Sequence, residues 1–189
     1  MTPKKWKLLS KKDVSPHKWF PVEMRSYRLP DGKKVEDFSV TTLADVSMII
    51  PITKERKVIL VNQFKPGVDE VILEFPAGRM ESRYKNFLEL AQHELEEEVG
   101  IKVEQDRLKY FATLSGFTTK GSEKVLFYFA SGLEFNSKQR LDHSEDIEIV
   151  QLSFKDMDAY IYNGKIWAAQ TIAGWELAKK HFPEEFNNV

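Results

Sequence analysis

Residues 76–101 read PAGRMESRYKNFLELAQHELEEEVGI, and the second half of this stretch carries four glutamates, at positions 94, 96, 97 and 98. Asn86 followed by Glu89 matches a capping box, and Gly100 is a typical residue just beyond a helix. We therefore predict a helix between Asn86 and Gly100. Like charges this close on a helix repel one another, so the four glutamates need a physical explanation.

A helical wheel that advances about 100° per residue separates these glutamates into two groups. Glu96 falls, together with Glu89, opposite the apolar arc, where charged side chains are normally solvated. Glu98 falls inside the arc, and Glu94 and Glu97 fall at its edge or just beyond it. The residues of the apolar arc are Phe87, Leu88, Leu90, Ala91, Leu95 and Val99.

Clustered carboxylates on a partly buried face are costly unless a partner offsets their charge. A hard divalent cation such as Mg²⁺ or Mn²⁺ prefers oxygen ligands and would remove this cost. Glu94, Glu97 and Glu98 are therefore candidate metal ligands. The alternative interpretation is that all four glutamates lie on a solvated surface, because charge-rich helices are common.

The composition of the chain limits its class. Its 189 residues, of which 42% are hydrophobic, suffice for one globular domain with a sizeable core and a small appended piece. The net charge of −1 gives no electrostatic reason to expect nucleic acid or a membrane surface as a partner. The absence of cysteine excludes disulfides and thiolate metal sites. There is no secretory signal, and no apolar run approaches the roughly 20 residues that span a bilayer, so we expect a cytoplasmic protein.

Strand-like segments lie on both sides of the predicted helix. The Asp31-Gly32 pair between two of them is a strong hairpin signal. Two helices are expected near the C-terminus, at residues 154–164 and 168–181. The pattern predicts a mixed α/β (α+β) fold, in which helices pack against a mixed sheet. The predicted strands are residues 22–29, 34–42, 46–52, 57–64, 71–75, 108–114, 124–130 and 147–153.

The stretch HELEEEVGI resembles the end of the Nudix box, G-x5-E-x7-R-E-U-x-E-E-x-G-U, in which U is aliphatic. The chain is similar to the branch of ADP-ribose pyrophosphatases and nucleoside diphosphate sugar hydrolases. This resemblance implies an α/β/α sandwich with a mixed sheet over residues 46–189. It also implies an N-terminal antiparallel β subdomain, residues 1–45, through which the protein forms a homodimer. The residues on fixed positions of the box are Glu94, Leu95, Glu97, Glu98, Gly100 and Ile101.

The resemblance also implies the metal ligands, and it shows where this chain departs from the pattern. In the family, Glu94, Glu97 and Glu98 would bind the metal, and the carbonyl of Ala77 would complete its shell. Gly78 stands one residue earlier than the first glycine of the box. Tyr84 or Lys85 occupies the position of its first glutamate. His93 replaces the arginine that helps to orient the catalytic glutamates in the family.

Two further glutamates are candidates by resemblance. Glu123 lies in the polar loop of residues 114–130, and in this branch the corresponding loop carries a glutamate that acts as catalytic base or positions the attacking water. The alternative is an ordinary hairpin tip. Glu148 lies in HSEDIEIVQL, a segment that resembles one near the metal side of the cleft and that also contains Glu145. Glu148 is a reserve candidate for ligand or base, and the alternative is that these acidic residues lead into an exposed strand.

Substrate-binding candidates complete the expected site. Lys65 occupies a position often held by a substrate-binding arginine, although a surface charge at a strand end is equally compatible. Arg79 is a further candidate for binding phosphate. Trp19 and Phe20 match an aromatic position that stacks on the base in some members, and the alternative for such a pair is core or dimer interface.

The resemblance implies hydrolysis of the pyrophosphate bond of a nucleoside diphosphate sugar, with Mg²⁺ as cofactor and Mn²⁺ as its possible substitute. ADP-ribose is the first candidate, with AMP and ribose 5-phosphate as products. The alternatives are GDP-mannose or another nucleotide sugar as substrate, or a degenerate domain that binds ADP-ribose as a sensor. We expect no nucleic acid and no membrane among its partners.

Overall fold

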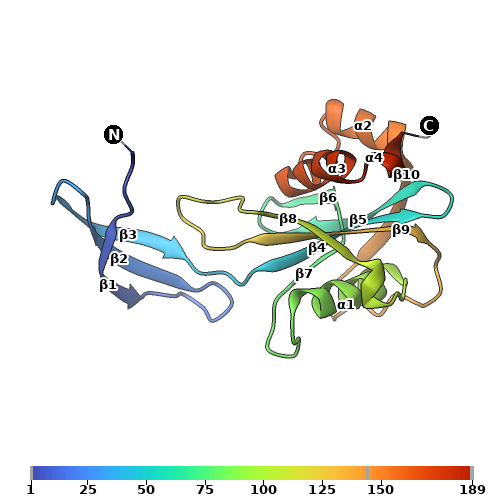
Figure 1. The fold of residues 1–189 in the computed structure, drawn as a ribbon. Helices are drawn as coiled ribbons and strands as arrows, with labels where there is room; N and C mark the ends of the chain where they lie inside the picture. The colour runs from blue at the N-terminus through green and yellow to red at the C-terminus, as the bar shows by residue number, and fades with distance from the viewer. Residues whose placement is uncertain (1, 144, 188–189) are drawn as a thin grey trace. The chain divides into compact units, whose positions relative to one another are not determined.

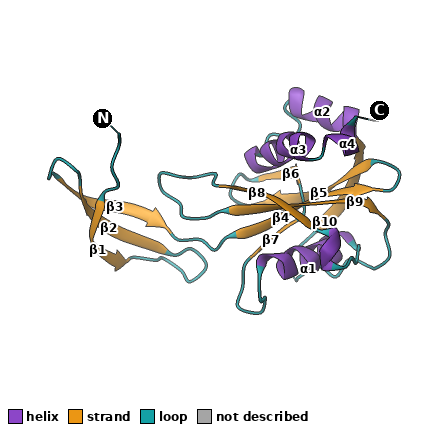
Figure 2. Cartoon of the chain, viewed as in Figure 1, coloured by secondary structure: helices purple, strands orange, loops and turns teal. Residues whose placement is uncertain are grey.

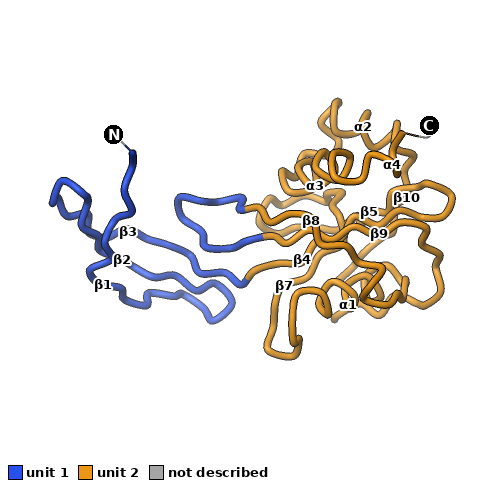
Figure 3. Tube along the Cα trace, in the orientation of Figure 1, with its two compact units in different colours: residues 1–44, 115–124 blue, residues 45–114, 125–189 orange. Residues whose placement is uncertain are grey.

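The structure is a computed structural model that describes residues 2–143 and 145–187. It divides into two compact units, which Figure 3 colours separately. Unit 1 comprises residues 1–44 and 115–124, and unit 2 comprises residues 45–114 and 125–189. The loop of residues 115–124, which contains Glu123, therefore belongs to the N-terminal unit although it connects two strands of unit 2.

Unit 1 is built on a three-stranded antiparallel sheet with the order β1-β2-β3. Asp31 and Gly32 form the β2–β3 turn, where Gly32 has a φ of 89° and the Asp31 carboxylate accepts a hydrogen bond from the Lys33 N–H at 3.0 Å. The predicted hairpin and N-terminal antiparallel sheet are thereby confirmed. Its strands are β1 (Lys7–Asp13), β2 (Val22–Arg28) and β3 (Lys34–Thr41).

Unit 2 contains a seven-stranded mixed sheet, drawn in orange in Figure 2. Its main order is β10-β5-β4-β9-β8, with β6 paired to β5 and β7 paired to β4. The β4–β9 pair is parallel and the other pairs are antiparallel. Its strands are β4 (Val46–Thr53), β5 (Lys57–Lys65), β6 (Glu70–Glu74), β7 (Ala77–Arg79), β8 (Lys109–Leu114), β9 (Val125–Leu133) and β10 (Ile147–Ser153).

Helices cover both faces of this sheet, as Figure 1 shows, with α1 on one face and the three C-terminal helices on the other. The alternation of side chains along β4 explains how one strand serves two cores. Ile49 packs in the core under α1, whereas Ile50 packs in the opposite core with Trp175. The predicted α/β/α arrangement is confirmed. The helices are α1 (Phe87–Val99), α2 (Phe154–Tyr162), α3 (Ala169–His181) and α4 (Pro183–Phe186), with one 3₁₀ turn at Gln105–Arg107.

Within residues 2–143 and 145–187, no helix has the length and apolar character needed to cross a membrane.

Candidate active site

Helix α1 is capped at both ends by the residues from which its ends were predicted, Asn86 and Gly100. The Asn86 side chain accepts a hydrogen bond from the Glu89 N–H at 2.8 Å, and Glu89 accepts one from the Lys85 N–H at 2.7 Å. At the other end, Gly100 adopts a φ of 75°, and its N–H donates to the Glu96 carbonyl at 2.9 Å. These caps satisfy backbone groups that a helix leaves unpaired, and so they set the register of every side chain on α1.

The helical register places three of the four clustered glutamates in the interior. Glu94, Glu97 and Glu98 are 8%, 9% and 4% exposed, so the division predicted by the helical wheel is confirmed for them. Glu96 differs from the expectation of a freely solvated side chain. It is half-buried and accepts hydrogen bonds from the Ser137 hydroxyl, at 3.1 Å, and from the Arg140 guanidinium.

Strand β7 lies against two of the buried glutamates, Glu94 and Glu98. The Glu98 carboxylate accepts a hydrogen bond from the Ala77 N–H at 3.0 Å. The Glu94 side chain lies so close to Gly78 that a Cβ atom there would stand 2.1 Å from its Cδ and Oε1 atoms. Gly78 is thus the glycine that the site requires, even though it stands one residue earlier than the pattern of the box.

The segment that follows β9 holds the last turn of α1. The Gln139 side-chain amide donates to the Glu98 carbonyl at 2.7 Å. The backbone N–H of Arg140 donates to the Glu97 carbonyl at 2.9 Å, and that of Ser137 donates to the Gly100 carbonyl at 2.9 Å. Because these bonds pair carbonyls that a helix end leaves free, they fix the backbone that carries Glu97 and Glu98.

Burial dominates the electrostatics of the three carboxyls. It raises the pKa of Glu94 to about 8, and the negative charge of Glu97 adds to the effect. Burial and then the charge of Glu94 raise the pKa of Glu98 to about 8, although the hydrogen bond from Ala77 opposes this rise. Burial also raises the pKa of Glu97, with an opposing contribution from His93. Three carboxyls that are costly to ionise in one place form a site whose charge a cation would stabilise.

Glu145, in the segment that by resemblance lies near the metal side of the cleft, adds a fourth negative charge. After burial, which is the largest cause, its charge contributes to the raised pKa of Glu94, Glu97 and Glu98. Its carboxylate accepts a hydrogen bond from the Asp142 N–H at 3.0 Å, in the turn before β10. Glu148, the reserve candidate, is exposed on β10 and accepts a hydrogen bond from the Asn62 amide at 3.0 Å.

The chemistry of these residues fits a hard divalent cation, because all the side-chain donors are carboxylate oxygens. Glu98 accepts the hydrogen bond from the Ala77 N–H, and Glu97 Oε2 lies 2.8 Å from His93 Nδ1. In the described part of the chain, no three His, Asp or Glu side chains are gathered as ligands of a single ion. Glu94, Glu97, Glu98 and the Ala77 carbonyl are the groups that would hold the metal.

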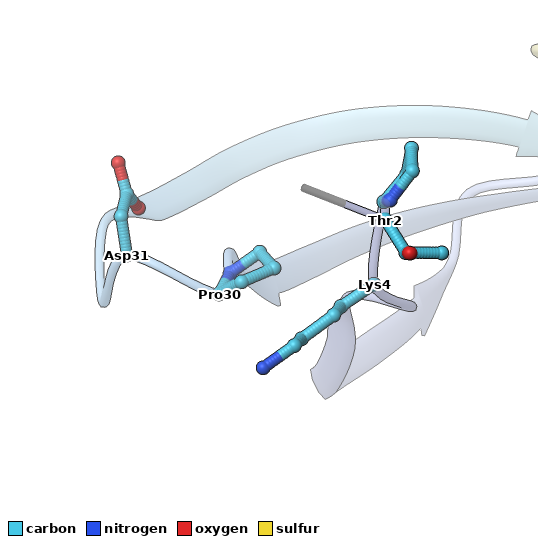
Figure 4. Close-up of a pocket in the computed structure, with 5 residues that line it drawn as sticks. Thr2, Lys4, Pro30 and Asp31 are labelled. Atoms are coloured by element: carbon cyan, nitrogen blue, oxygen red, sulfur yellow. The ribbon is translucent and has the colours of Figure 1, made fainter.

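A pocket of about 450 Å³ opens beside Glu97. Three parts of the chain line this pocket: α1, the exposed loop of residues 81–83 that precedes it, and the segment after β9. Its lining carries both positive and negative side chains: Arg83, His93, Glu96, Glu97, Arg140 and Asp142. Unit 1 has a separate hollow of about 620 Å³, shown in Figure 4, whose lining of Thr2, Pro3, Lys4, Pro30 and Asp31 includes none of the predicted site residues.

The remaining predicted residues have varied surroundings. Lys65, at the end of β5, forms an ion pair with Glu74 at 3.0 Å, and its positive charge opposes the burial that raises the pKa of Glu98. Arg79 is exposed at the end of β7. Glu123 belongs to unit 1, and its role as base stays a prediction. Trp19 and Phe20 lie in unit 1 and are exposed, at 59% and 51%.

Comparison of the sequence with known protein families identifies the family to which the chain belongs. Residues 42–174 match the family model of the NUDIX domain. The chain therefore belongs to the NUDIX domain family, and it is a hydrolase of that family.

Individual relatives agree with this assignment. A methanol dehydrogenase activator from Bacillus methanolicus is 30% identical over 153 residues, which is 80% of each chain. An ADP-ribose pyrophosphatase from Bacillus subtilis is 27% identical over 167 residues, 87% of this chain and 88% of the relative. An ADP-sugar pyrophosphatase from Mus musculus is 36% identical over 113 residues, 54% of this chain and 51% of the relative. The predicted resemblance to the ADP-ribose pyrophosphatase branch is thereby confirmed.

A solved structure shares the fold. The crystal structure of an ADP compounds hydrolase superposes with a TM-score of 0.84 at 21% sequence identity, and the match covers 98% of both chains.

Proposed function

We propose that this protein hydrolyses the pyrophosphate bond of a nucleoside diphosphate sugar in a reaction that depends on Mg²⁺ or, as a substitute, Mn²⁺. The observation that carries the proposal is the burial of Glu94, Glu97 and Glu98, two of which contact β7, in a chain that matches the NUDIX domain. Carboxylates buried so close together bind a cation in preference to remaining unpaired.

The reaction explains why such a site is needed. A pyrophosphate is multiply anionic and repels an incoming hydroxide, and bound Mg²⁺ would neutralise that charge and orient the attacking water. Glu123 is proposed to take the proton from water. Lys65 and Arg79 are proposed to bind the phosphates, and Trp19 with Phe20 to contact the base. Glu148 stays the reserve for ligand or base.

ADP-ribose is the proposed substrate, with AMP and ribose 5-phosphate as products. Two relatives, named ADP-ribose pyrophosphatase and ADP-sugar pyrophosphatase, support this choice. The alternative left open by the sequence, a sensor that binds the nucleotide sugar without cleaving it, rests on the replacement of the arginine of the box by His93, and the two pyrophosphatase relatives argue against it. We further propose that the protein is a cytoplasmic homodimer that pairs through residues 1–45.

Product analysis with purified protein and Mg²⁺ tests the proposal. The substrates are ADP-ribose, ADP-glucose, GDP-mannose, a dinucleoside polyphosphate and NAD. Glu98→Gln removes one buried carboxylate, and Glu55→Gln, in the exposed β4–β5 turn, is the matched control. We expect nucleoside monophosphate and sugar phosphate from the wild type and from Glu55→Gln, and a loss of turnover in Glu98→Gln. Bound nucleotide with no product from any substrate would instead establish the sensor.

A further inference from the structure

Arg83 brings a positive charge to the edge of the carboxylate site, and it is not among the residues that the sequence predicts for that site. It lies in the loop before α1 and lines the pocket of about 450 Å³ together with Glu97. Its charge also opposes the burial that raises the pKa of Glu94 and of Glu97. Both observations place the guanidinium near two of the three proposed metal ligands.

Two contacts hold the Arg83 side chain, and neither requires its terminal nitrogens. Its Nε atom lies 3.3 Å from Oε2 of Glu81. Its Cζ atom lies 4.8 Å from the centroid of the Tyr84 ring, in a cation–π contact that depends on the positive charge. Tyr84 is 8% exposed, so its ring is a fixed support. The terminal nitrogens of a guanidinium carry four further N–H donors, whose spacing matches two oxygens of a phosphate.

The other arginine of the pocket is more firmly bound within the protein. The Arg140 guanidinium donates to the half-buried Glu96 carboxylate, and the Arg140 backbone N–H donates to the Glu97 carbonyl at 2.9 Å. The side chains of Arg83 and Glu81, in contrast, are 49% and 48% exposed. Because an ion pair this exposed contributes little free energy, Arg83 can exchange Glu81 for another anion at small cost.

We propose that Arg83 binds a phosphate group of the nucleotide sugar beside the metal site. The inference rests on the proposed function for its substrate, whose two phosphates carry the negative charge that Arg83 would meet. In the absence of substrate, the guanidinium repels a cation that approaches Glu94 and Glu97. Arg83 therefore has opposite effects on two ligands, since it weakens the binding of metal and strengthens the binding of substrate.

Two binding measurements without turnover separate these effects. Mn²⁺ binding without nucleotide is measured from the electron paramagnetic resonance signal of the free ion. Calorimetry at saturating Mg²⁺ measures the binding of α,β-methylene ADP-ribose, in which a CH₂ group replaces the bridging oxygen of the pyrophosphate and prevents hydrolysis there. The variants are Arg83→Ala and Arg83→Lys. Lys102→Ala, which removes an exposed positive charge just after α1, is the matched control.

We expect Arg83→Ala to bind the analogue at least about 10-fold more weakly, as for the loss of a hydrogen bond between charged groups. The same variant should bind Mn²⁺ more tightly, by up to about 5-fold, because a nearby exposed positive charge is removed. Arg83→Lys keeps the charge and loses the planar fork. It should therefore bind Mn²⁺ like the wild type and recover part of the affinity for the analogue.

Analogue affinity in Arg83→Ala that equals that of Lys102→Ala would overturn the inference, and so would wild-type protein that binds no analogue. A parallel loss of Mn²⁺ and analogue binding would also overturn it, because a purely structural role of Arg83 affects both ligands in the same direction. Competition by AMP and by ribose 5-phosphate identifies the phosphate concerned: the affinity for at least one of them should fall in Arg83→Ala, and unchanged affinity for both would contradict the proposal.

Failure of the proposed hydrolysis is a separate result. Wild-type protein that binds the analogue through Arg83 but releases no product from ADP-ribose would refute the reaction and leave the phosphate site intact.

Discussion

Replacement of Gly78 by alanine would place a methyl group where the Glu94 side chain now lies. The new Cβ atom would stand 2.1 Å from Cδ and Oε1 of Glu94 and 2.4 Å from its Cγ. The backbone at Gly78 tolerates alanine, because its φ lies outside the left-handed region. The three nearest atoms all belong to the flexible side chain of Glu94, so Glu94 is the first group that has to move.

The size of that movement follows from the contact distance. Ordinary van der Waals contact begins at 3.4 Å, so the carboxyl carbon has to shift by at least about 1.3 Å. Misplacement of a catalytic group by about 1 Å can lower the rate by about 100-fold. The strained side chain costs about 1 kcal/mol, which a folded domain tolerates. We therefore expect kcat to fall by about 100-fold while the fold survives.

The assay compares Gly78→Ala with Gly67→Ala. Gly67 lies in the β5–β6 turn, where a Cβ atom meets no atom within 4 Å, so it controls for the change from glycine to alanine. Turnover of ADP-ribose at saturating Mg²⁺ and the midpoint of thermal unfolding are measured for both. Gly78→Ala with the turnover of Gly67→Ala would refute the reasoning, because it would show that the position of Glu94 does not matter.

Three other predictions concern the same helix and the proposed base. The pKa of about 8 for Glu94 and Glu98 lies above the 4.5 of an ordinary glutamate. The folded state therefore holds more protons between these pH values, and without metal the free energy of unfolding should fall as pH rises from 4.5 to 8, by at most about 1.4 kcal/mol per pH unit for each group. Thermal melting in EDTA measures this fall, and a midpoint that rises with pH would contradict it. Gln139→Ala should lower the free energy of unfolding by about 1 kcal/mol, because the Glu98 carbonyl loses its partner; urea unfolding measures it, and an unchanged value would show that solvent replaces the bond. Glu123→Gln should lower kcat with little change in KM if Glu123 is the base, whereas a raised KM with unchanged kcat would assign it to substrate binding.

The parts of the fold that the sequence predicted depend on local signals. Asn86 and Gly100 mark the ends of α1 through backbone chemistry that acts within one helical turn, and the spacing of the glutamates follows from the helix alone. The Asp31-Gly32 hairpin is local in the same way. The parallel pairing of β4 with β9 joins residues far apart in the chain, and no local signal specifies it.

Short or fully exposed elements escaped prediction for a different reason. Strand β1, KLLSKKD, is exposed along its whole length and lacks the alternation that marks a half-buried strand. Strand β7 has three residues and is defined by its pairing with β4. Neither strand contains enough buried apolar side chains to be recognised from the amino-acid sequence alone.

The candidate site shows the same division. The burial of Glu94, Glu97 and Glu98 follows from helical periodicity, which sequence supplies. The contact of Glu94 with Gly78 and the charge of Glu145 near the site depend on tertiary packing. The contact of His93 with Glu97 was accessible from their spacing of four residues, which places side chains side by side on a helix.

The exposed loop at residues 81–83 has a practical use, because the chain contains no cysteine. Ser82 is exposed and precedes Arg83, which lines the pocket beside Glu97. Ser82→Cys would introduce a single thiol, so a maleimide dye would label one known position without removal of any native residue that contacts the glutamates. The emission of that dye would report the binding of metal or nucleotide at the pocket in real time. The loop is therefore a suitable position for a site-specific fluorescent label.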